Sequence, residues 1–199
     1  MSVTIRGRAV PRVRGSAVAP DQRIASVLIA LGSNLGDRVR TLRAAVCELQ
    51  DVVHVVRVSG MIETDAVDAP PGSPPFLNMV VLGWTHLAPE ALLDQLLAIE
   101  KRLGRRRPAP RNAPRMIDLD LILHSANVRW SSRLTLPHPR YLAREFVMGP
   151  LRELNLPWRD PRTGVLLSSR ALESRRRDTR EKKRSIVPPL PAAAGRGPG

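Results

Sequence analysis

The sequence predicts an α+β fold of the ferredoxin-like type, in which an antiparallel sheet has helices packed on one of its faces. Two observations predict it. A strand–helix–strand pattern occurs twice along the chain, which is the split βαβ arrangement. The chain also lacks the G-x-G-x-x-G turn and the additional βα units of a doubly wound fold. With 199 residues, 43% of them hydrophobic, it can form a single core.

The first strand–helix–strand pattern begins with the continuous apolar run SVLIAL at residues 26–31, which has the length of a central strand. Turn-forming residues follow at 32–37, and apolar residues then recur at helical spacing over 38–49. β-branched residues predict a strand over 52–58. Cys47, the sole cysteine, lies among apolar residues of the predicted helix, so we expect a small core residue and no disulfide.

The second pattern follows a loop rich in Pro, Gly and Asp at residues 63–75. The segment FLNMVVLGW at 76–84 predicts a strand, and helical spacing over 89–103 predicts a helix that ends at a glycine. After a basic loop that contains prolines, alternating apolar residues predict a strand over 117–123.

Smaller elements follow the second pattern. Residues 128–136 predict a short hairpin. Residues 141–154 predict one or two short helices, interrupted near Gly149 and Pro150.

The net charge of +14 is concentrated at the two ends of the chain. Residues 25–158 contribute only +3, whereas residues 1–24 contribute +4 and residues 159–199 contribute +7. The ends are rich in Pro, Gly and Arg. They predict disordered basic tails at 1–24 and 169–199, on either side of one domain at 25–168. Because the excess charge lies in these tails, it argues against a nucleic-acid function for the domain.

Several other classes are excluded by what the sequence lacks. No apolar run has the length of a membrane span. The N-terminal segment lacks the apolar stretch of a secretory signal, so we expect a cytoplasmic protein. There is also no G-x-x-x-x-G-K-[ST] loop, so any nucleotide phosphates must be held by other groups.

Asp118 and Asp120 are the strongest indication of chemistry. Alternation along the predicted strand places both carboxylates on one face, roughly 7 Å apart. The opposite, apolar face is expected to carry the alternating residues Ile117, Leu119, Leu121 and Leu123. Two like charges at this distance favour binding of a divalent cation such as Mg²⁺. The alternative interpretation is a solvated strand end.

The loop before this strand carries five arginines in eleven positions, Arg105, Arg106, Arg107, Arg111 and Arg115. Guanidinium groups beside a carboxylate pair predict a clamp for the phosphates of a nucleotide. A solvated basic loop is the alternative.

Two further groups suit a flat heterocycle and its phosphates. Phe76 and Asn78 share one strand face and offer a stacking surface and an amide that can pair with a ring edge. His138 lies between two prolines, a short distance before Arg144 and Phe146. The restricted backbone allows the imidazole of His138 to be aimed, although a single histidine is more often structural.

Taken together, these segments resemble the 6-hydroxymethyl-7,8-dihydropterin pyrophosphokinase family of folate biosynthesis. The resemblance is carried by the blocks ALGSNLGD at 30–37, PFLN at 75–78, and the segments 100–120 and 134–151. It covers about residues 26–160. The combination of R-x-x-P-R-x-I-D-L-D with a later L-P-H-P-R is highly specific.

The resemblance implies a monomeric, cytoplasmic, ferredoxin-like enzyme whose partners are ATP and 6-hydroxymethyl-7,8-dihydropterin. It would transfer pyrophosphate from ATP to the pterin and release AMP. Asp118 and Asp120 would be the metal ligands for two Mg²⁺ ions. These two carboxylates, together with Arg105 and Arg115, would be the catalytic residues.

The resemblance also implies the residues that bind each substrate. Those for the pterin would be Thr64, Val67, Phe76, Asn78 and Phe146. Those for ATP would be Glu100, Arg105, Arg107, Arg111, Arg115, Ile117, Thr135, His138 and Arg144. The floor of the site would be formed by Gly32, Ser33 and Asn34.

The chain departs from the family at several positions, and two other functions are considered. Many relatives have Trp where this chain has Asn112, and Asp65 and Ala66 replace a frequent proline. One alternative is a transferase of the same class that acts on a related ring. The other is an RNA-binding module, which would need aromatic residues in a K/R-G-F/Y segment that this chain lacks.

Overall fold

The computed structural model describes residues 24–106, 108–110, 112–125, 127–155, 158–164 and 167. The elements in chain order are β1 (Ala25–Ser33), α1 (Arg38–Leu49), β2 (His54–Val58), β3 (Ile62–Thr64), β4 (Phe76–Thr85), α2 (Pro89–Arg102), β5 (Asp118–His124), β6 (Arg129–Trp130), β7 (Thr135–Leu136), the 3₁₀ helix η1 (Tyr141–Ala143) and α3 (Glu145–Glu153). The predicted tails, apart from Ile24, lie outside the described residues.

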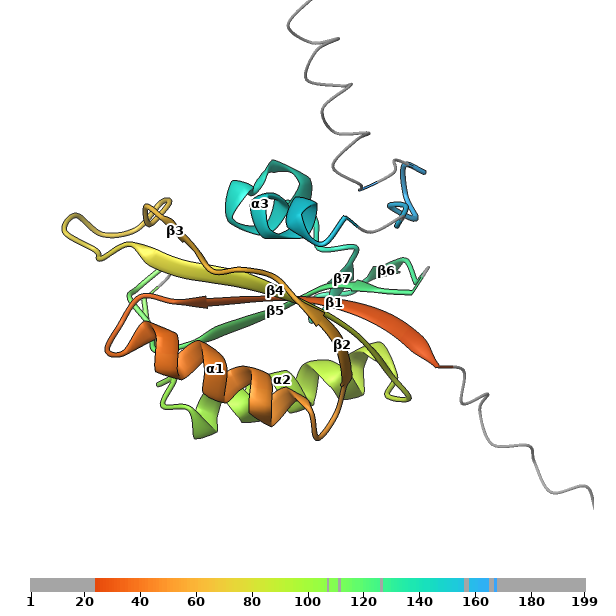
Figure 1. Cartoon of the computed structure of the whole chain (residues 1–199), viewed down its shortest axis with the longest axis horizontal. Helices are drawn as coiled ribbons and strands as arrows, with labels where there is room; N and C mark the ends of the chain where they lie inside the picture. The colour runs from red at the N-terminus through yellow and green to blue at the C-terminus, as the bar shows by residue number, and fades with distance from the viewer. Residues whose placement is uncertain are drawn as a thin grey trace, which may run out of the picture.

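The main sheet has the strand order β2-β4-β1-β5, and β3 pairs with β4 outside this path. All neighbouring strands are antiparallel. Each of α1 and α2 connects two strands that have a third strand between them, which is the split βαβ topology. The predicted α+β, ferredoxin-like class is therefore confirmed (Figure 1).

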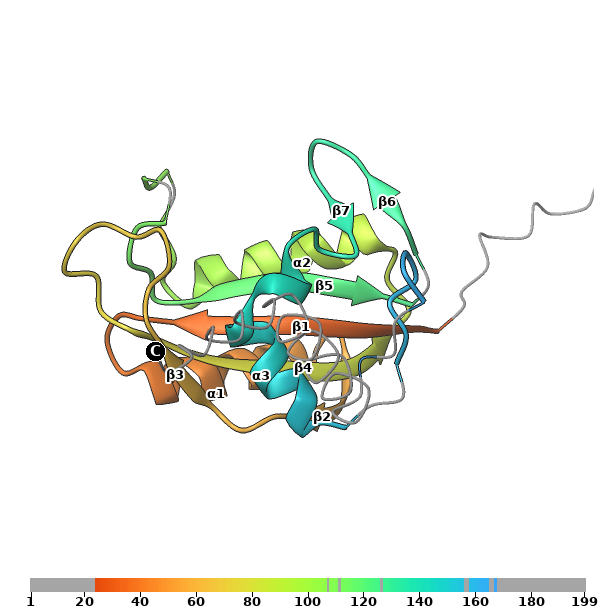
Figure 2. The ribbon, with the colours of Figure 1, turned by 90° about the horizontal axis from the view of Figure 1, so that it is seen from above.

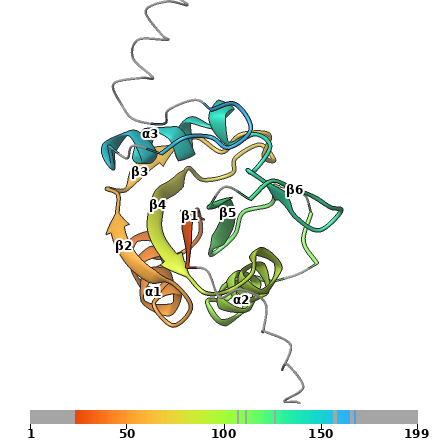
Figure 3. The ribbon, with the colours of Figure 1, turned by 90° about the vertical axis from the view of Figure 1, so that its right-hand side faces the viewer.

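Helices cover both faces of this sheet, whereas the sequence predicted helices on one face. Figures 1 and 3 show α1 and α2 on one side and α3 on the other. The reason lies in β1, whose residues are buried from Val27 to Ser33. A continuous apolar run has two faces that need cover. On one side Ile29 packs with the α1 and α2 core, and on the other Leu28 packs with Val147 of α3.

The helix α1 has the predicted bounds and begins at a side-chain cap. The Asp37 carboxylate accepts a hydrogen bond from the Arg40 backbone N–H at 3.0 Å, and this satisfies a free donor of the first turn. Leu42, Ala45 and Leu49 form its buried stripe. Cys47 is exposed, so the prediction of a core residue was wrong. It follows Ala45 by two positions, and two residues rotate a helix by about 200°.

The predicted apolar face of β5 is interrupted by a β-bulge. The register with β1 shifts between Leu28 and Ile29, so that Leu121 pairs with Ile29 and Leu123 with Leu28. An extra residue in one strand reverses the faces that follow it. Leu119 and Leu121 therefore face α1 and α2, but Leu123 packs in the α3 core. The prediction for Leu123 was wrong for this reason.

Two other segments differ from prediction. The loop predicted from residue 63 begins later, because Ile62–Thr64 forms β3, an edge strand paired with the start of β4. In the last segment, the break between η1 and α3 lies at Arg144, where φ is −96° and ψ is 104°. It does not lie at Pro150, which is buried inside α3. Burial of that face against the sheet offsets the hydrogen bond that proline cannot donate.

Candidate active site

The site lies on the α3 side of the sheet, and its floor is made of small residues. Gly32 of β1 pairs with Asn78 on one neighbouring strand and with Asp118 on the other. One row along, Ala30 pairs with Asp120. Because strands lie about 4.8 Å apart, the Asn78 and Asp118 backbones are separated by roughly 10 Å. A shallow floor therefore lies between an amide and a pair of carboxylates.

Both carboxylates are paired with arginines from elsewhere in the chain. Asp118 forms ion pairs with Arg105 and with Arg115, the latter at 3.2 Å. Asp120 forms an ion pair with Arg144, also at 3.2 Å. Their side chains are 22% and 35% exposed respectively, so both carboxylates can reach solvent or a ligand.

Asp120 lies in an environment that disfavours a bare negative charge. Burial raises the pKa of Asp120 to about 6, and the nearby charge of Asp118 raises it further against the lowering effects of Arg144 and Arg115. A divalent cation would relieve both effects. Among the residues that the structure describes, there is no group of three or more His, Cys, Asp or Glu side chains able to hold a metal. The carboxylate pair would need water or phosphate as additional ligands.

Glu100 of α2 lies beneath this cluster and is only 2% exposed. Its carboxylate accepts a hydrogen bond from the Leu119 backbone N–H at 2.8 Å and also pairs with Arg105. Burial lowers the pKa of Arg105, but the charges of Asp118 and Glu100 outweigh it and leave the pKa raised. Glu100 therefore joins α2 to β5 and holds a charged guanidinium beside Asp118.

Asn34, at the end of β1, holds the arginine loop and the loop before β4 together. Its side chain accepts from the Arg115 backbone N–H at 2.7 Å and donates to the Pro74 carbonyl at 3.1 Å. The guanidinium of Arg115 lies 5.3 Å from the centre of the Phe76 ring. Its Nε atom is buried and has no hydrogen-bond partner among the described residues. A polar donor in this state suits a phosphate oxygen.

Phe76, Asn78 and Thr64 meet at one end of the floor. Asn78 is buried and donates to the Thr64 hydroxyl at 2.9 Å. Thr64 is placed there by the pairing of β3 with β4. Phe146 of α3 lies below Arg144, whose guanidinium is 5.3 Å from the ring centre. An aromatic ring, an amide and a hydroxyl therefore come together from β3 and β4. Phe146 lies on α3, which packs against the same two strands.

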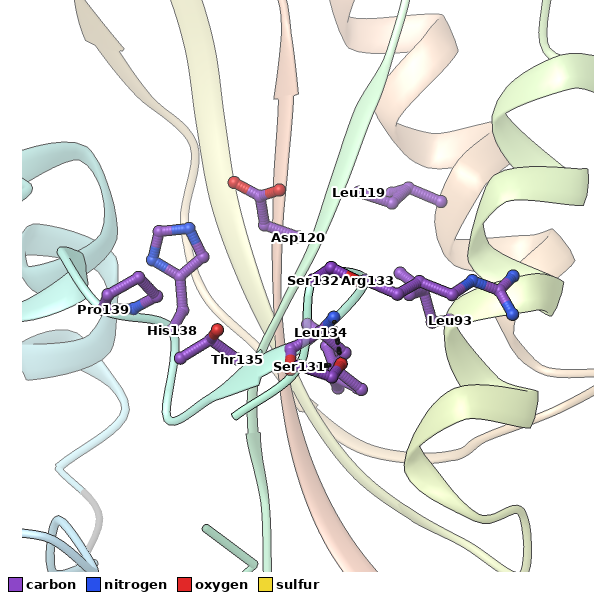
Figure 4. A pocket seen from close by; sticks show the side chains of 11 residues that line it. Leu93, Leu119, Asp120, Ser131, Ser132, Arg133, Leu134, Thr135, His138 and Pro139 are labelled. Atoms are coloured by element: carbon purple, nitrogen blue, oxygen red, sulfur yellow. Dashed lines mark hydrogen bonds between the residues drawn. The ribbon is translucent and has the colours of Figure 1, made fainter. Parts of the chain in front are cut away.

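A cavity of about 270 Å³ opens on the other side of Asp120. Figure 2 shows β5, the β6–β7 hairpin and α2 side by side. The residues that line the cavity come from these three elements and from the segment after β7 (Figure 4). Its lining includes the predicted residues Thr135 and His138, together with Leu121, Ser131, Ser132 and Arg133. The last four residues were not predicted from the sequence to belong to a site. An alternating apolar strand hides Leu121, and Ser131, Ser132 and Arg133 belong to a turn without a chemical signature.

The His138 ring is held at the mouth of this cavity (Figure 4). Its backbone N–H donates to the Ile122 carbonyl at 2.9 Å, and its Nε2 lies 3.3 Å from a guanidinium nitrogen of Arg144. Burial, together with the charges of Arg144 and Arg140, lowers the pKa of His138 to about 4. The imidazole is therefore neutral at pH 7 and can accept a hydrogen bond.

Two predicted site residues lie outside the part of the chain that the structure describes, and two others are not brought into this arrangement by their side chains. Arg107 and Arg111 lie outside the described residues. Ile117 is fully buried in the core under α1 and α2, so only its backbone could reach a ligand. Val67 is 66% exposed in the loop after β3.

Fold and site together define a class: an enzyme that moves a phosphate-bearing group from a nucleotide. Transfer of a phosphoryl-type group needs charged groups that hold the phosphates in place. The site offers a pair of carboxylates, three arginines and a neighbouring cavity. Comparisons with known proteins narrow this class.

The family model for 7,8-dihydro-6-hydroxymethylpterin-pyrophosphokinase matches residues 28–156. A 2-amino-4-hydroxy-6-hydroxymethyldihydropteridine pyrophosphokinase of Bacillus subtilis is 44% identical over 128 residues, covering 63% of this chain and 75% of the relative. The corresponding protein of Synechocystis sp. is 37% identical over 145 residues, covering 72% of this chain and 73% of the relative. The chain belongs to this family, and its activity is the transfer of pyrophosphate to hydroxymethyldihydropterin in folate synthesis.

Other relatives are much longer. A folate synthesis bifunctional protein of Arabidopsis thaliana is 39% identical over 129 residues, which cover 64% of this chain but 26% of that protein. Among solved structures, the wild-type HPPK-DHPS of Plasmodium falciparum matches with a TM-score of 0.60 and 12% identity, over 85% of this chain and 44% of that one. At this identity the match supports the fold alone. The remaining parts of these longer proteins have no counterpart in the match.

Proposed function

We propose that Asp118 and Asp120 are the residues that would hold two Mg²⁺ ions when ATP binds, with the pterin on one side of the carboxylates and the nucleoside on the other. The observation that carries this proposal is the row Asn78, Gly32 and Asp118 across three adjacent strands. It leaves an open floor between a ring-binding end and a carboxylate end. The ions would neutralise phosphate charge and lower the pKa of the pterin hydroxyl.

The cavity beside Asp120 suits the nucleoside of ATP. Its volume of about 270 Å³ is lined by apolar and hydroxyl-bearing residues, including Leu93, Leu121 and Thr135. A neutral His138 at the mouth can accept a hydrogen bond from a ribose hydroxyl. Since Asp120 also lines the cavity, the triphosphate would leave it next to the carboxylates.

Three arginines would bind the triphosphate by exchanging partners. Arg105, Arg115 and Arg144 each pair with Asp118 or Asp120 in the structure. When metal occupies the carboxylates, each guanidinium can turn to a phosphate oxygen at little cost, because one charged partner replaces another. Glu100 would keep Arg105 in position during this exchange, since it also bonds to the β5 backbone. Arg107 and Arg111 remain predicted contacts in the same loop.

The pterin would stack between Phe76 and Phe146, with its edge on Asn78 and Thr64. Stacking on two rings and pairing with an amide recognise a flat heterocycle that carries both donors and acceptors. The Asn78 amide already donates to the Thr64 hydroxyl at 2.9 Å, so the polar atoms of both side chains lie together where the ring edge would bind. A transferase that acts on a related ring is the alternative. Val67, in the loop after β3, stays a predicted backbone contact.

The reaction itself needs positioning more than covalent help from the protein. The pterin hydroxyl oxygen would form a bond to the β-phosphorus, while the bond from that phosphorus to the α,β-bridging oxygen breaks. AMP leaves with the bridging oxygen, and the hydroxyl proton passes to solvent. Arginines that close over the phosphates would also exclude water, which competes as acceptor.

A direct test is incubation of the purified chain with ATP, Mg²⁺ and 6-hydroxymethyl-7,8-dihydropterin. AMP should form only when the pterin is present, and it should disappear with a chelator or with Asp118→Ala. Release of ADP would contradict pyrophosphoryl transfer. AMP formed at the normal rate by Asp118→Ala would contradict the metal assignment.

Two expectations about the whole protein are also proposals. A monomer and a cytoplasmic location follow from the resemblance and from the sequence. Among the described residues no helix is long and apolar enough to cross a membrane. Two plant relatives carry the word mitochondrial in their names, so location differs within the family.

A further inference from the structure

A buried pair of residues outside the site links the last described segment of the chain to Arg144, which lies in the site. Tyr141 and Asp160 are both fully buried, and the tyrosine hydroxyl donates to the Asp160 carboxylate at 2.6 Å. The family match ends at residue 156. Asp160 therefore lies beyond the segment that identifies the family, yet it contacts a residue between His138 and Arg144.

The Asp160 carboxylate has a full set of partners. Its second oxygen accepts from the backbone N–H groups of Arg162 and Thr163 at 2.7 and 3.0 Å. The Arg162 guanidinium lies 3.6 Å from the carboxylate, and the Gly164 N–H closes the turn onto the Asp160 carbonyl at 2.8 Å. A buried anion held by four groups is a rigid acceptor.

Tyr141 passes this constraint to the site through the backbone of η1. Its N–H donates to the His138 carbonyl at 3.2 Å, and its own carbonyl accepts from the Arg144 N–H at 3.1 Å. The two residues that it joins, His138 and Arg144, contact each other at 3.3 Å through their side chains. Arg144 in turn pairs with Asp120 at 3.2 Å.

We propose that Asp160 is a positioning residue that acts through Tyr141 to fix the guanidinium of Arg144 for the triphosphate. This inference rests on the proposed role of Arg144 in binding the phosphates of ATP. Arg144 has extended backbone at the junction of η1 and α3, and this junction has no side-chain cap. The anchored tyrosine ring therefore adds a restraint on this junction from a segment outside the two helices.

Removal of the Tyr141 hydroxyl should weaken catalysis without removing any group from the site. Tyr141→Phe keeps the ring and its packing, and Asp160→Asn keeps the shape of the acceptor. We expect kcat/KM for ATP to fall roughly ten- to hundredfold in both, since small displacements of a positioned group have effects of this size. Tyr141→Phe is the variant of choice if Asp160→Asn does not fold.

Coupling to Arg144 distinguishes positioning from a general loss of stability. In an Arg144→Ala background, Tyr141→Phe should cause no further fall in kcat/KM. Glu153→Ala is the matched control, since Glu153 accepts a hydrogen bond from the Gly60 N–H at 3.0 Å and lies at the opposite end of α3 from Arg144. It should lower the melting temperature and leave kcat/KM unchanged.

Two results would overturn the inference. One is a normal kcat/KM for Tyr141→Phe with a lowered melting temperature, and the other is a full additional loss in the Arg144→Ala background. A normal kcat/KM for Arg144→Ala alone would refute the phosphate role under the proposed function as well. Loss in Arg144→Ala with additive loss in the double variant would leave that role intact and refute only the link to Asp160.

Discussion

Gly32 lies so close to Asn78 that a Cβ atom at position 32 would be 3.0 Å from the Asn78 amide oxygen. The same Cβ would lie 3.4 Å from the Phe76 ring. Any side chain at position 32 would therefore crowd the proposed pterin end of the site, so that glycine suits this point of the strand. Gly32 is one of the small residues that keep the floor open.

Gly32→Ala should weaken pterin binding more than ATP binding. The added methyl group displaces the Asn78 amide and the Phe76 ring from their present positions, and a methyl-sized misfit costs roughly tenfold or more in affinity. Titration of pterin and of ATP separately, by calorimetry or fluorescence, measures the two effects. An equal loss for both ligands would show that the substitution disturbs the sheet as a whole.

Asp120→Ala should reduce pyrophosphoryl transfer by at least about 100-fold while the fold is retained. The fold should persist because the change removes a partly buried carboxylate that lies beside a like charge. Circular dichroism and steady-state assays measure the two properties. Glu48→Ala removes a carboxylate of a surface ion pair with Arg102 and should leave the rate unchanged, so a similar loss in that control would contradict the prediction.

Asn112→Ala should loosen the contact between the two loops that flank the site. Asn112 donates to the Asp68 carbonyl at 2.8 Å, and this hydrogen bond joins the arginine loop directly to the loop after β3. Loss of one such hydrogen bond costs about 1 kcal/mol, or roughly fivefold in the KM for pterin. Ser73→Ala is the matched control, because Ser73 bonds to Pro70 within one loop. An effect of equal size in the control would argue against a bridge.

The ionisation of His138 should make the folded state less stable in mild acid. Burial and the charges of Arg144 and Arg140 lower its pKa to about 4 in the fold, whereas an unfolded histidine titrates near about 6.5. The unfolded state therefore binds more protons between these values. The contribution of His138 to the free energy of unfolding is complete above about pH 6.5 and is lost as the pH falls towards about 4.

NMR titration of the His138 ring and urea unfolding at several pH values measure this effect. His138→Gln should show a smaller loss of stability than the parent chain between neutral pH and pH values near the lowered pKa. Arg140→Gln should raise the pKa of His138, since it removes one of the positive charges that lower it. An unchanged pKa in Arg140→Gln would contradict the electrostatic part of the explanation.

Much of the fold followed from local patterns. The bounds of α1 matched the prediction because its apolar spacing and its Asp37 cap agree. The face of Leu123 and the short strand β3 could not be predicted. A bulge depends on pairing with a strand far away in the sequence, and three residues at a sheet edge carry little periodicity.

The sequence by itself determined the kind of chemistry. Alternation placed Asp118 and Asp120 on one strand face, and the arginines before them indicated phosphate. The residue types and spacing of these aspartates and arginines are local properties of the sequence, so they do not depend on how the chain packs. The resemblance to the pyrophosphokinase family rests on the same residues.

Only the tertiary structure decided which partner each group has. Glu100 stays a predicted nucleotide contact, and the structure adds that it supports Arg105 and β5. Asn34 joins two loops, and Asp160 reaches Tyr141 from 19 positions away. Such contacts join segments that are distant along the chain, and their strength depends on burial, which no local spacing contains.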